Sequence, residues 1–343
     1  MYWRRVLRMA ALCHDIGHLP FSHAAEKELL PAGWVHERLT VEIINSPSMQ
    51  LLWEKMTPPL RSQDVAKLAV GQKHLPGESF SDWEAVLSEI IISDALGVDR
   101  MDYLLRDSLH TGVPTGRVDH FRLIETMRIL PKPGDVGESI EPELGVEQGG
   151  LHAAEALLLA RYFMFSQVYY HPVRVVYDIH LLDFLKDWLP HGRFSIKPNE
   201  ALSMTDTEVI QTMTKAAKST TEAGHEPARR ITERDHFKLI WERNPQDIAT
   251  NPSAGELIFK ATKGKYGAKA VRRKDYASPG TGIDFPVLQR DGRVGSAHAL
   301  SAVLPVLPQL VYDYVFIHPD LRERAEQWLE ENRPRILQPV REE

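Results

Sequence analysis

The sequence predicts a mainly α-helical protein with a large helical core and a smaller α+β lobe at its C-terminal end. In the first two thirds of the chain, apolar residues recur at helical spacing, beginning with residues 3–11. In the last third, short runs rich in β-branched and aromatic residues, at 237–241 and 312–317, are typical of strands. The 343 residues are enough for two domains, which we expect at 1–190 and 191–343.

The first helix leads directly to His14, and we expect it to end at Gly17 and Pro20. Ser22 is a suitable N-cap for a second helix through residue 30, because its hydroxyl can accept a hydrogen bond from an early backbone N–H group. Further helices are predicted at residues 36–44, 62–70, 80–96, 99–109, 205–218 and 322–332.

Residues 151–189 have the pattern of one or two long helices. Pro172 should bend or divide them, because proline cannot donate the helical hydrogen bond. Residues 130–138 and the pair Gly149-Gly150 predict loops around a short, strand-like insert. A further turn-rich stretch lies at residues 278–282.

Composition and charge argue against several classes of protein. The net charge of -6 and the pI near 6.2 are unlike those of a general nucleic-acid coat. No stretch approaches the ~18 uninterrupted apolar residues of a membrane-spanning helix, and the basic N-terminus continues into a predicted helix rather than a signal peptide. The single cysteine, Cys13, suits a reducing compartment. We therefore expect a cytoplasmic protein without membrane contact.

The most informative stretch, residues 11–23, has three histidines and one aspartate. His14 and Asp15 offer an imidazole and a carboxylate side by side, which suits a divalent metal ion. His18 follows four residues later and would share a helical face with His14. Such a metal lowers the pKa of bound water and promotes hydrolysis. Taken alone, the His14-Asp15 pair is more typical of a chance pairing that contains an ordinary core histidine.

A second cluster lies on the helix predicted at residues 99–109. Asp99, Tyr103 and Asp107 recur every four residues and therefore line one side of that helix. With Arg100, the segment offers carboxylates for a metal, a guanidinium for phosphate and a phenol. The alternative is a solvated helix face with ordinary charge pairs, but these polar residues line up with apolar ones.

A third cluster, at residues 161–174, is dense in aromatic side chains. Arg161, Phe165 and Tyr169 share one helical face. Aromatic residues at this density usually form core, so this cluster alone does not indicate a site.

Together the three clusters resemble the HD-domain phosphohydrolases of the deoxynucleoside triphosphate triphosphohydrolase type, the group of bacterial dGTPases and the mammalian SAM- and HD-domain dNTPase. The run His14-Asp-Ile-Gly-His-Leu-Pro-Phe-Ser-His23 matches the HD motif of that family, and Asp99-Arg-Met-Asp-Tyr-Leu-Leu-Arg-Asp107 matches its second block. The resemblance spans roughly residues 10–177, and it implies an HD-domain fold for the helical core.

The resemblance also implies a role for individual residues. The metal ligands would be His14, Asp15 and Asp99. The acid–base group around the scissile phosphate would be His18, Glu26, His36 and Glu37. The substrate contacts would be His23, Arg100 and Arg161 for the triphosphate, Tyr103 and Asp107 for the deoxyribose, and Tyr169 and His171 for the sugar and base end. The implied reaction releases a deoxynucleoside and triphosphate.

The chain departs from the family at the metal site. The family's first metal ligand is a histidine upstream of the HD pair, whereas none of the thirteen residues before His14 is a histidine. Either the chain begins late or its site has one protein ligand fewer, which should weaken metal binding. The family often has aspartate where this chain has Glu26, so the relay geometry can differ.

The sequence leaves several points open. The divalent metal is manganese, magnesium, iron, nickel or zinc. The function could instead be that of another HD-superfamily nucleotide phosphohydrolase, such as a nucleotidase or phosphodiesterase, or of a degenerate regulator that binds nucleotides or nucleic acid. The basic run at residues 263–274, which begins with Lys263 and ends with Lys274, could contact nucleic acid, although a solvated loop is slightly favoured. The family resemblance also implies a homo-oligomer.

Overall fold

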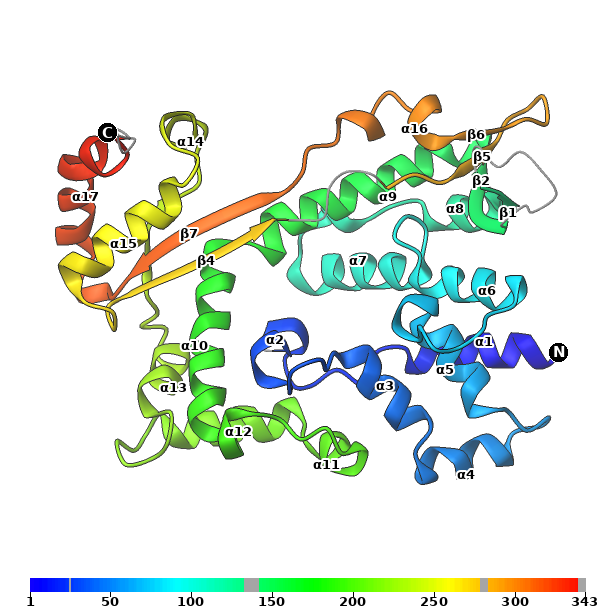
Figure 1. Cartoon of the computed structure of the whole chain (residues 1–343), viewed down its shortest axis with the longest axis horizontal. Coiled ribbons are helices and arrows are strands. Elements are labelled where there is room, and N and C mark those ends of the chain that lie inside the picture. Colours follow the sequence, from blue (N-terminus) through cyan, green and yellow to red (C-terminus); the bar gives the residue numbers. More distant parts are fainter. Residues whose placement is uncertain (25, 133–141, 278–282, 339–343) are drawn as a thin grey trace. The chain divides into compact units, whose positions relative to one another are not determined.

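The computed structural model describes residues 1–24, 26–132, 142–277 and 283–338 (Figure 1). The chain forms two compact units, and both draw on segments from either side of residue 190. The first unit comprises Met1–Phe165, Arg193–Asp206 and Gly280–Pro308, and the second comprises Ser166–Gly192, Thr207–Pro279 and Gln309–Glu343. The expected domain division at residue 190 stays a prediction.

The first unit is mostly helical. Its α-helices are α1 (Tyr2–Cys13), α2 (Glu26–Leu29), α3 (His36–Ile44), α4 (Pro47–Lys55), α5 (Ser62–Val70), α6 (Asp82–Ile92), α7 (Val98–Thr111), α8 (His120–Thr126), α9 (Leu151–Met164), α11 (Pro198–Ser203) and α16 (Ala297–Leu300). A four-stranded sheet has the order β1 (Met127–Pro131), β2 (Pro142–Glu147), β5 (Pro286–Leu288), β6 (Val294–Ser296). The β2–β5 pair is parallel, and the two outer pairs are antiparallel.

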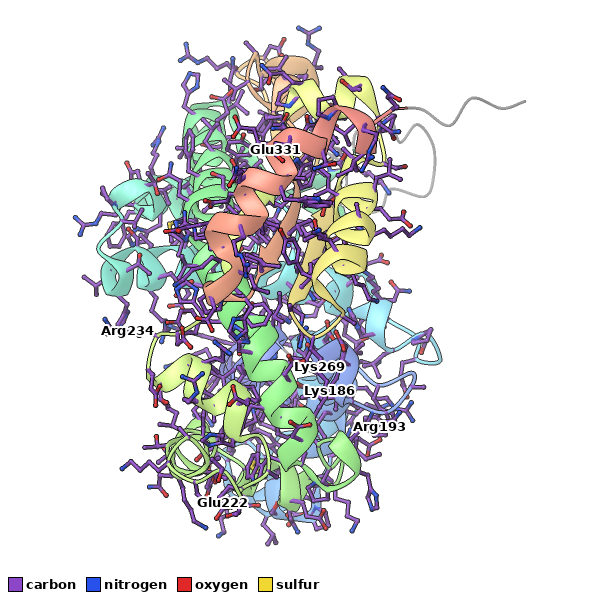
Figure 2. All side chains as sticks on the ribbon, turned by 90° about the vertical axis from the view of Figure 1, so that its left-hand side faces the viewer. Lys186, Arg193, Glu222, Arg234, Lys269 and Glu331 are labelled. Carbon is purple, nitrogen blue, oxygen red and sulfur yellow. The ribbon has the colours of Figure 1, made fainter. Side chains whose placement is uncertain are left out.

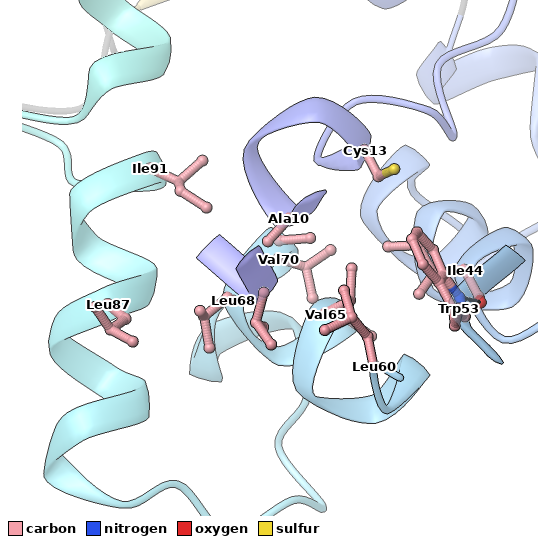
Figure 3. Packing of buried hydrophobic residues seen from close by; sticks show 13 residues of the cluster. Ala10, Cys13, Ile44, Trp53, Leu60, Val65, Leu68, Val70, Leu87 and Ile91 are labelled. Atoms are coloured by element: carbon pink, nitrogen blue, oxygen red, sulfur yellow. Dashed lines mark hydrogen bonds between the residues drawn. The ribbon is translucent and has the colours of Figure 1, made fainter. Parts of the chain in front are cut away.

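The hydrophobic core of the first unit includes residues of α1, α5 and α6 (Figure 3). Val6, Ala10 and Cys13 are spaced by four and three residues, so they share the face of α1 that is buried. Trp53 is almost fully buried as well, and its indole N–H donates to the Ile44 carbonyl over 2.9 Å. Full burial of a large apolar side chain contributes about 1.5–3 kcal/mol. This core fixes the C-terminal end of α1, directly before His14.

The second unit contains a three-stranded antiparallel sheet in the order β3 (Lys238–Glu242), β7 (Val311–Ile317), β4 (Val271–Ala277). Its helices are α10 (Pro172–Trp188), α12 (Asp206–Ala216, beginning at the last residue of the first unit's segment), α13 (His225–Thr232), α14 (Pro245–Thr250), α15 (Ala254–Tyr266) and α17 (Arg322–Ile336). One core cluster joins the sheet to α15 and α17 through residues that include Ala254, Ile258, Val315, Ile317 and Leu329.

Short helical turns complete the chain. They are η1 (Ser22–Ala24), η2 (Gln72–His74), η3 (Pro114–Gly116), η4 (Gln148–Gly150), the π-helix η5 (Phe165–Tyr169), η6 (Pro190–Gly192), η7 (Leu304–Val306) and η8 (Pro319–Leu321). Among the described residues, no helix combines the length and apolar character needed to cross a membrane.

The predicted fold class, a helical core with a smaller α+β lobe, is confirmed. The predicted helices at 36–44 and 62–70 match α3 and α5 at both ends. The division at Pro172 is also confirmed, because α10 begins there with proline in its first turn. Residues 278–282 and most of the insert after residue 132 lie outside the described residues.

Three local predictions are wrong. The first helix ends at Cys13 rather than at Gly17, because the chain turns immediately after it. Ser22 does not cap a helix but lies inside a 3₁₀ turn with a positive φ of 50°, and α2 begins only at Glu26. The basic run at 263–274 is not a loop, since it contains the end of α15 and the first part of β4.

Candidate metal and phosphate site

A tight turn after α1 carries the His14-Asp15 pair, and Thr40 of α3 holds this turn in place. The Thr40 hydroxyl donates to the His14 carbonyl over 3.1 Å and accepts from the Gly17 N–H over 3.0 Å. Gly17 has to be glycine, because a Cβ there would lie only 2.2 Å from the His36 carbonyl oxygen. The close approach of α3 therefore fixes the direction of both potential metal ligands.

His14, Asp15 and Asp99 converge on one position, although His14 and Asp99 are 85 residues apart in the chain. His14 Nε2 lies 3.1 Å from Asp99 Oδ1 and 3.4 Å from Asp15 Oδ2. On the other side of the ring, Nδ1 lies 2.9 Å from the Ala11 carbonyl, which can only accept a hydrogen bond. Nδ1 therefore carries the proton in the neutral ring, and the lone pair of Nε2 is directed to the carboxylates.

A divalent metal ion fits this donor set. Ligands bound at about 2.1 Å and at right angles to one another lie about 3 Å apart, close to the spacing found here. Three protein ligands leave coordination positions for water or substrate. Burial would lower the pKa of His14, but the hydrogen bond to Asp99 and the charge of Asp15 raise it to about 9. A bound metal must therefore displace a proton from this ring.

A second group lies next to the first and contains His18, His23, Glu26 and His36, whose potential ligand atoms all lie within 4.8 Å of one another. Glu26 links two of the rings, because its carboxylate lies 2.9 Å from His36 Nδ1 and 3.2 Å from His23 Nδ1. The rings of His18 and His36 stack with centroids 3.9 Å apart. His18 Nε2 is also 3.6 Å from Asp15 Oδ1, so the two groups are continuous.

The second group places an imidazole with a lowered pKa beside one with a raised pKa. Burial and the neighbouring His36 and His23 lower the pKa of His18 to about 3. Burial would also lower the pKa of His36, but its hydrogen bond to Glu26 and the charge of that carboxylate raise it. Although burial raises the pKa of Glu26, hydrogen bonds from His23 and His36 outweigh it and lower the pKa. Groups with such opposed environments are typical of acid–base pairs.

Arg100, Tyr103 and Arg161 form the third part of the site. The Tyr103 phenol is partly buried and accepts a hydrogen bond from Arg161. Burial and the nearby charge of Arg161 lower the pKa of Arg100, so the two guanidinium groups lie close together. Arg161 Nε and His18 Nδ1 are buried and have no hydrogen-bond partner in the described part of the chain. Buried polar atoms without partners are costly, and such atoms indicate a place where water or a ligand belongs.

Two further predicted site residues, Glu37 and Asp107, lie on different helices, Glu37 on α3 and Asp107 on α7. Glu37 lies 3.4 Å from His36 Nδ1 and 3.5 Å from His74 Nε2. It therefore links the second group to His74, a histidine that the sequence did not indicate. His74 follows Gly71 in an unremarkable polar segment, and nothing in its spacing indicates the site. Asp107 is partly buried on α7, two turns after Asp99.

Tyr169 and His171 belong to the second compact unit, so their role at the substrate stays a prediction. Within that unit, Tyr169 ends the π-helix η5, and the Nδ1 atom of His171 accepts from the Val173 N–H at the start of α10. The basic run also lies in the second unit. Its residue Arg273 forms a bidentate pair with the largely buried Asp313, at 2.8 and 2.9 Å.

Comparisons with known proteins agree with this geometry. Residues 4–107 match the HD domain family, and residues 118–256 match the HD associated region. An uncharacterized protein of Bacillus subtilis, YwfO, is 34% identical over 171 residues, which is 50% of this chain and 34% of YwfO. The deoxynucleoside triphosphate triphosphohydrolase SAMHD1 of Homo sapiens is 27% identical over 202 residues, 52% of this chain and 31% of that protein. The chain thus spans about a third of the length of these relatives.

Solved structures share the fold over most of the chain. A hypothetical protein from Aquifex aeolicus has a TM-score of 0.75 and 29% identity, and the match covers 95% of this chain and 80% of that one. A phosphohydrolase from Bacteroides thetaiotaomicron has a TM-score of 0.64 and 19% identity, with 91% and 79% covered. At that identity the second likeness concerns the fold alone.

Proposed function

We propose that the chain, which matches the HD domain family over residues 4–107 and the HD associated region over residues 118–256, hydrolyses deoxynucleoside triphosphates to a deoxynucleoside and triphosphate, with a divalent metal ion as cofactor. The observation that carries this proposal is the convergence of His14, Asp15 and Asp99 beside a histidine relay and two arginines. The SAMHD1 relatives, which carry this activity in their names, support the choice of substrate.

Hydrolysis requires an activated water, a proton for the leaving group and positive charge around the phosphate. A divalent ion held by His14, Asp15 and Asp99 would supply Lewis acidity at the scissile phosphate. In the proposed reaction, a bond forms between water oxygen and the α-phosphorus while the bond from that phosphorus to the 5′ oxygen breaks. The water proton passes to the group of His18, Glu26 and His36, and His36, whose pKa is raised by Glu26, would return a proton to the 5′ oxygen.

Arg100 and Arg161 are the proposed triphosphate contacts, since arginine binds phosphate oxygens in bidentate fashion. His23 is largely exposed at the edge of the relay, where it can reach a phosphate. Tyr103 carries the proposed sugar discrimination, because its phenol is held by a hydrogen bond from Arg161 and the ring beside a bound sugar would leave little room for a 2′-hydroxyl. Asp107, further along α7, would accept from the 3′-hydroxyl that both types of sugar possess.

The decisive experiment combines metal analysis of the purified protein with product analysis after incubation with single dNTPs and each candidate divalent ion. We expect triphosphate and the deoxynucleoside, identified by ³¹P NMR and chromatography. Asp99→Ala should abolish both metal binding and hydrolysis. Asp102→Ala on the same helix is the matched control, because Asp102 is exposed and pairs with Arg106 rather than with the site.

A second candidate, another nucleotide phosphohydrolase of the HD superfamily, is favoured by one observation. The group of His18, His23, Glu26 and His36 could itself hold an ion, and two adjacent metals are typical of phosphodiesterases and phosphatases. In the same assay this enzyme would release orthophosphate or a nucleoside monophosphate, and the protein would bind two ions. Nucleotide binding without any hydrolysis would instead favour the degenerate regulator.

A further inference from the structure

The second compact unit contains a pocket of about 550 Å³ between α10, α13 and the strands of its sheet. This volume lies in the usual range for small-molecule sites, about 300–1,000 Å³. Four side chains that line it are cationic, namely Lys186, Arg230, Lys269 and Arg272, and two others are histidines. None of these residues belongs to the candidate site in the first unit, so the proposed reaction leaves this pocket without a role.

The two arginines are fixed in place by their own partners. Arg272 Nη2 donates to Asp183 over 3.1 Å, and Arg230 Nη1 donates to Asp235 over 2.7 Å. Both guanidinium groups lie 5.5 Å from the centroid of the Phe237 ring. They therefore act as fixed positive charges at the wall of the pocket, and the carboxylates that pair with them hold their orientation rather than leave them mobile.

The two lysines provide the adjustable contacts. Lys186 lies on α10 and Lys269 in the turn before β4, and both side chains are exposed (Figure 2). No described residue pairs with the Lys269 ammonium group. A lysine presents three rotatable donors on a flexible chain and can therefore follow a ligand that the rigid arginines cannot.

Three carboxylates also line the pocket, Asp183, Asp187 and Glu226, and two of them pair with the arginines: Asp183 with Arg272 and Glu226 with Arg230. Burial lowers the pKa of His180 to about 4, and the charges of Arg230 and Arg272 contribute in the same direction. The charges of Arg230 and Arg272 thus disfavour a proton on the His180 ring, which lines the same pocket.

We propose that this pocket binds a compact, multiply charged phosphate anion, with Lys186 and Lys269 as the direct contacts and Arg230 and Arg272 as fixed countercharges. Phosphate is favoured because it presents several acceptor oxygens to converging cationic donors. Phe237, the one phenyl ring among the lining residues, is 5% exposed and cannot stack on a nucleobase. Recognition therefore rests on the phosphate groups, and an inorganic polyphosphate and a nucleotide are the two sources of this chemistry.

Isothermal titration of the full chain with inorganic triphosphate tests the proposal. The variant Lys186→Glu/Lys269→Glu should bind at least tenfold more weakly, and binding by the native protein should weaken with salt. Lys263→Glu/Lys265→Glu is the matched control, because it changes the net charge equally at exposed positions outside the pocket. Circular dichroism checks that all variants fold.

Because triphosphate is also a product of the proposed reaction, the titration is repeated with Arg161→Ala protein. Binding to the pocket should persist there, whatever the outcome for hydrolysis. The proposal is overturned if triphosphate binding weakens equally in both charge-reversal variants. It is also overturned if triphosphate binding disappears only in the Arg161→Ala protein. Citrate that binds as tightly as triphosphate would overturn the assignment to phosphate. Parallel titrations with ATP and dATP distinguish the sources, since equal affinity for all three phosphates indicates that the base makes no contact.

Discussion

Protonation of His180 should destabilise the second unit as the pH falls. The His180 side chain is 3% exposed, and its Nε2 accepts a hydrogen bond from the Phe237 N–H over 3.2 Å. A protonated ring could not accept this bond and would add a buried charge beside Arg230 and Arg272. The folded protein therefore holds His180 in its neutral form, with the proton on Nδ1.

The expected size follows from the pKa of His180, which folding lowers from 6.5 to about 4. Between these values the unfolded chain binds more protons than the folded one, so the free energy of unfolding falls as the pH decreases. The decrease in the free energy of unfolding begins near pH 6.5 and approaches about 3 kcal/mol at pH 4, since each pKa unit corresponds to about 1.4 kcal/mol.

The assay compares native protein with His180→Gln, whose amide oxygen can still accept from the Phe237 N–H. Urea unfolding at intervals from pH 7 to pH 4 gives the stability difference between the two proteins, and titrations of other groups cancel in that difference. Hydrogen exchange of α10 and β3 assigns the effect to the second unit, because the two units can unfold separately. The native protein should lose about 3 kcal/mol more than the variant. A difference that stays constant within about 0.5 kcal/mol, a typical error of such comparisons, refutes the reasoning.

Three further predictions concern the first unit. Removing the Asp99 carboxylate with Asp99→Ala should reduce metal affinity by more than the ~10–100-fold typical of residues behind the ligands, as measured by metal content after dialysis. Arg161→Ala should weaken nucleotide binding by ~1.5–3 kcal/mol, and unchanged kinetics in active protein would contradict its role. Deoxynucleotides should be hydrolysed much better than ribonucleotides in a competition assay. Tyr103→Ala should narrow that gap, whereas Asp107→Ala should lower activity on both sugars.

Local signals in the sequence determined many of the elements and the residue types of the site. The ends of α3 and α5 follow from their apolar spacing, and the break before α10 follows from Pro172. The His14-Asp15 pair was visible as a metal-binding combination because its two ligands are adjacent in the chain. Each of these features depends on residues within one or two turns of one another, which is the range over which a sequence pattern reports structure.

Only the tertiary structure decided how these pieces meet. Asp99 lies 85 residues after His14 in the chain, and their 3.1 Å separation depends on α6, which contacts both α1 and α7 within the first unit. Helical spacing would put His14 and His18 on one face only if both lay on a helix. Instead α1 ends at Cys13, and the clamp by Thr40 and the close contact at Gly17 hold the chain in a turn there. His74 left no signal in the sequence. The basic run at 263–274 indicated only Lys269 and Arg272 of the cationic pocket, since its other members come from separate segments. Such arrangements depend on packing between distant segments, in which each buried polar group must find a partner because an unpaired one is costly. A local sequence pattern does not specify which distant residue that partner is.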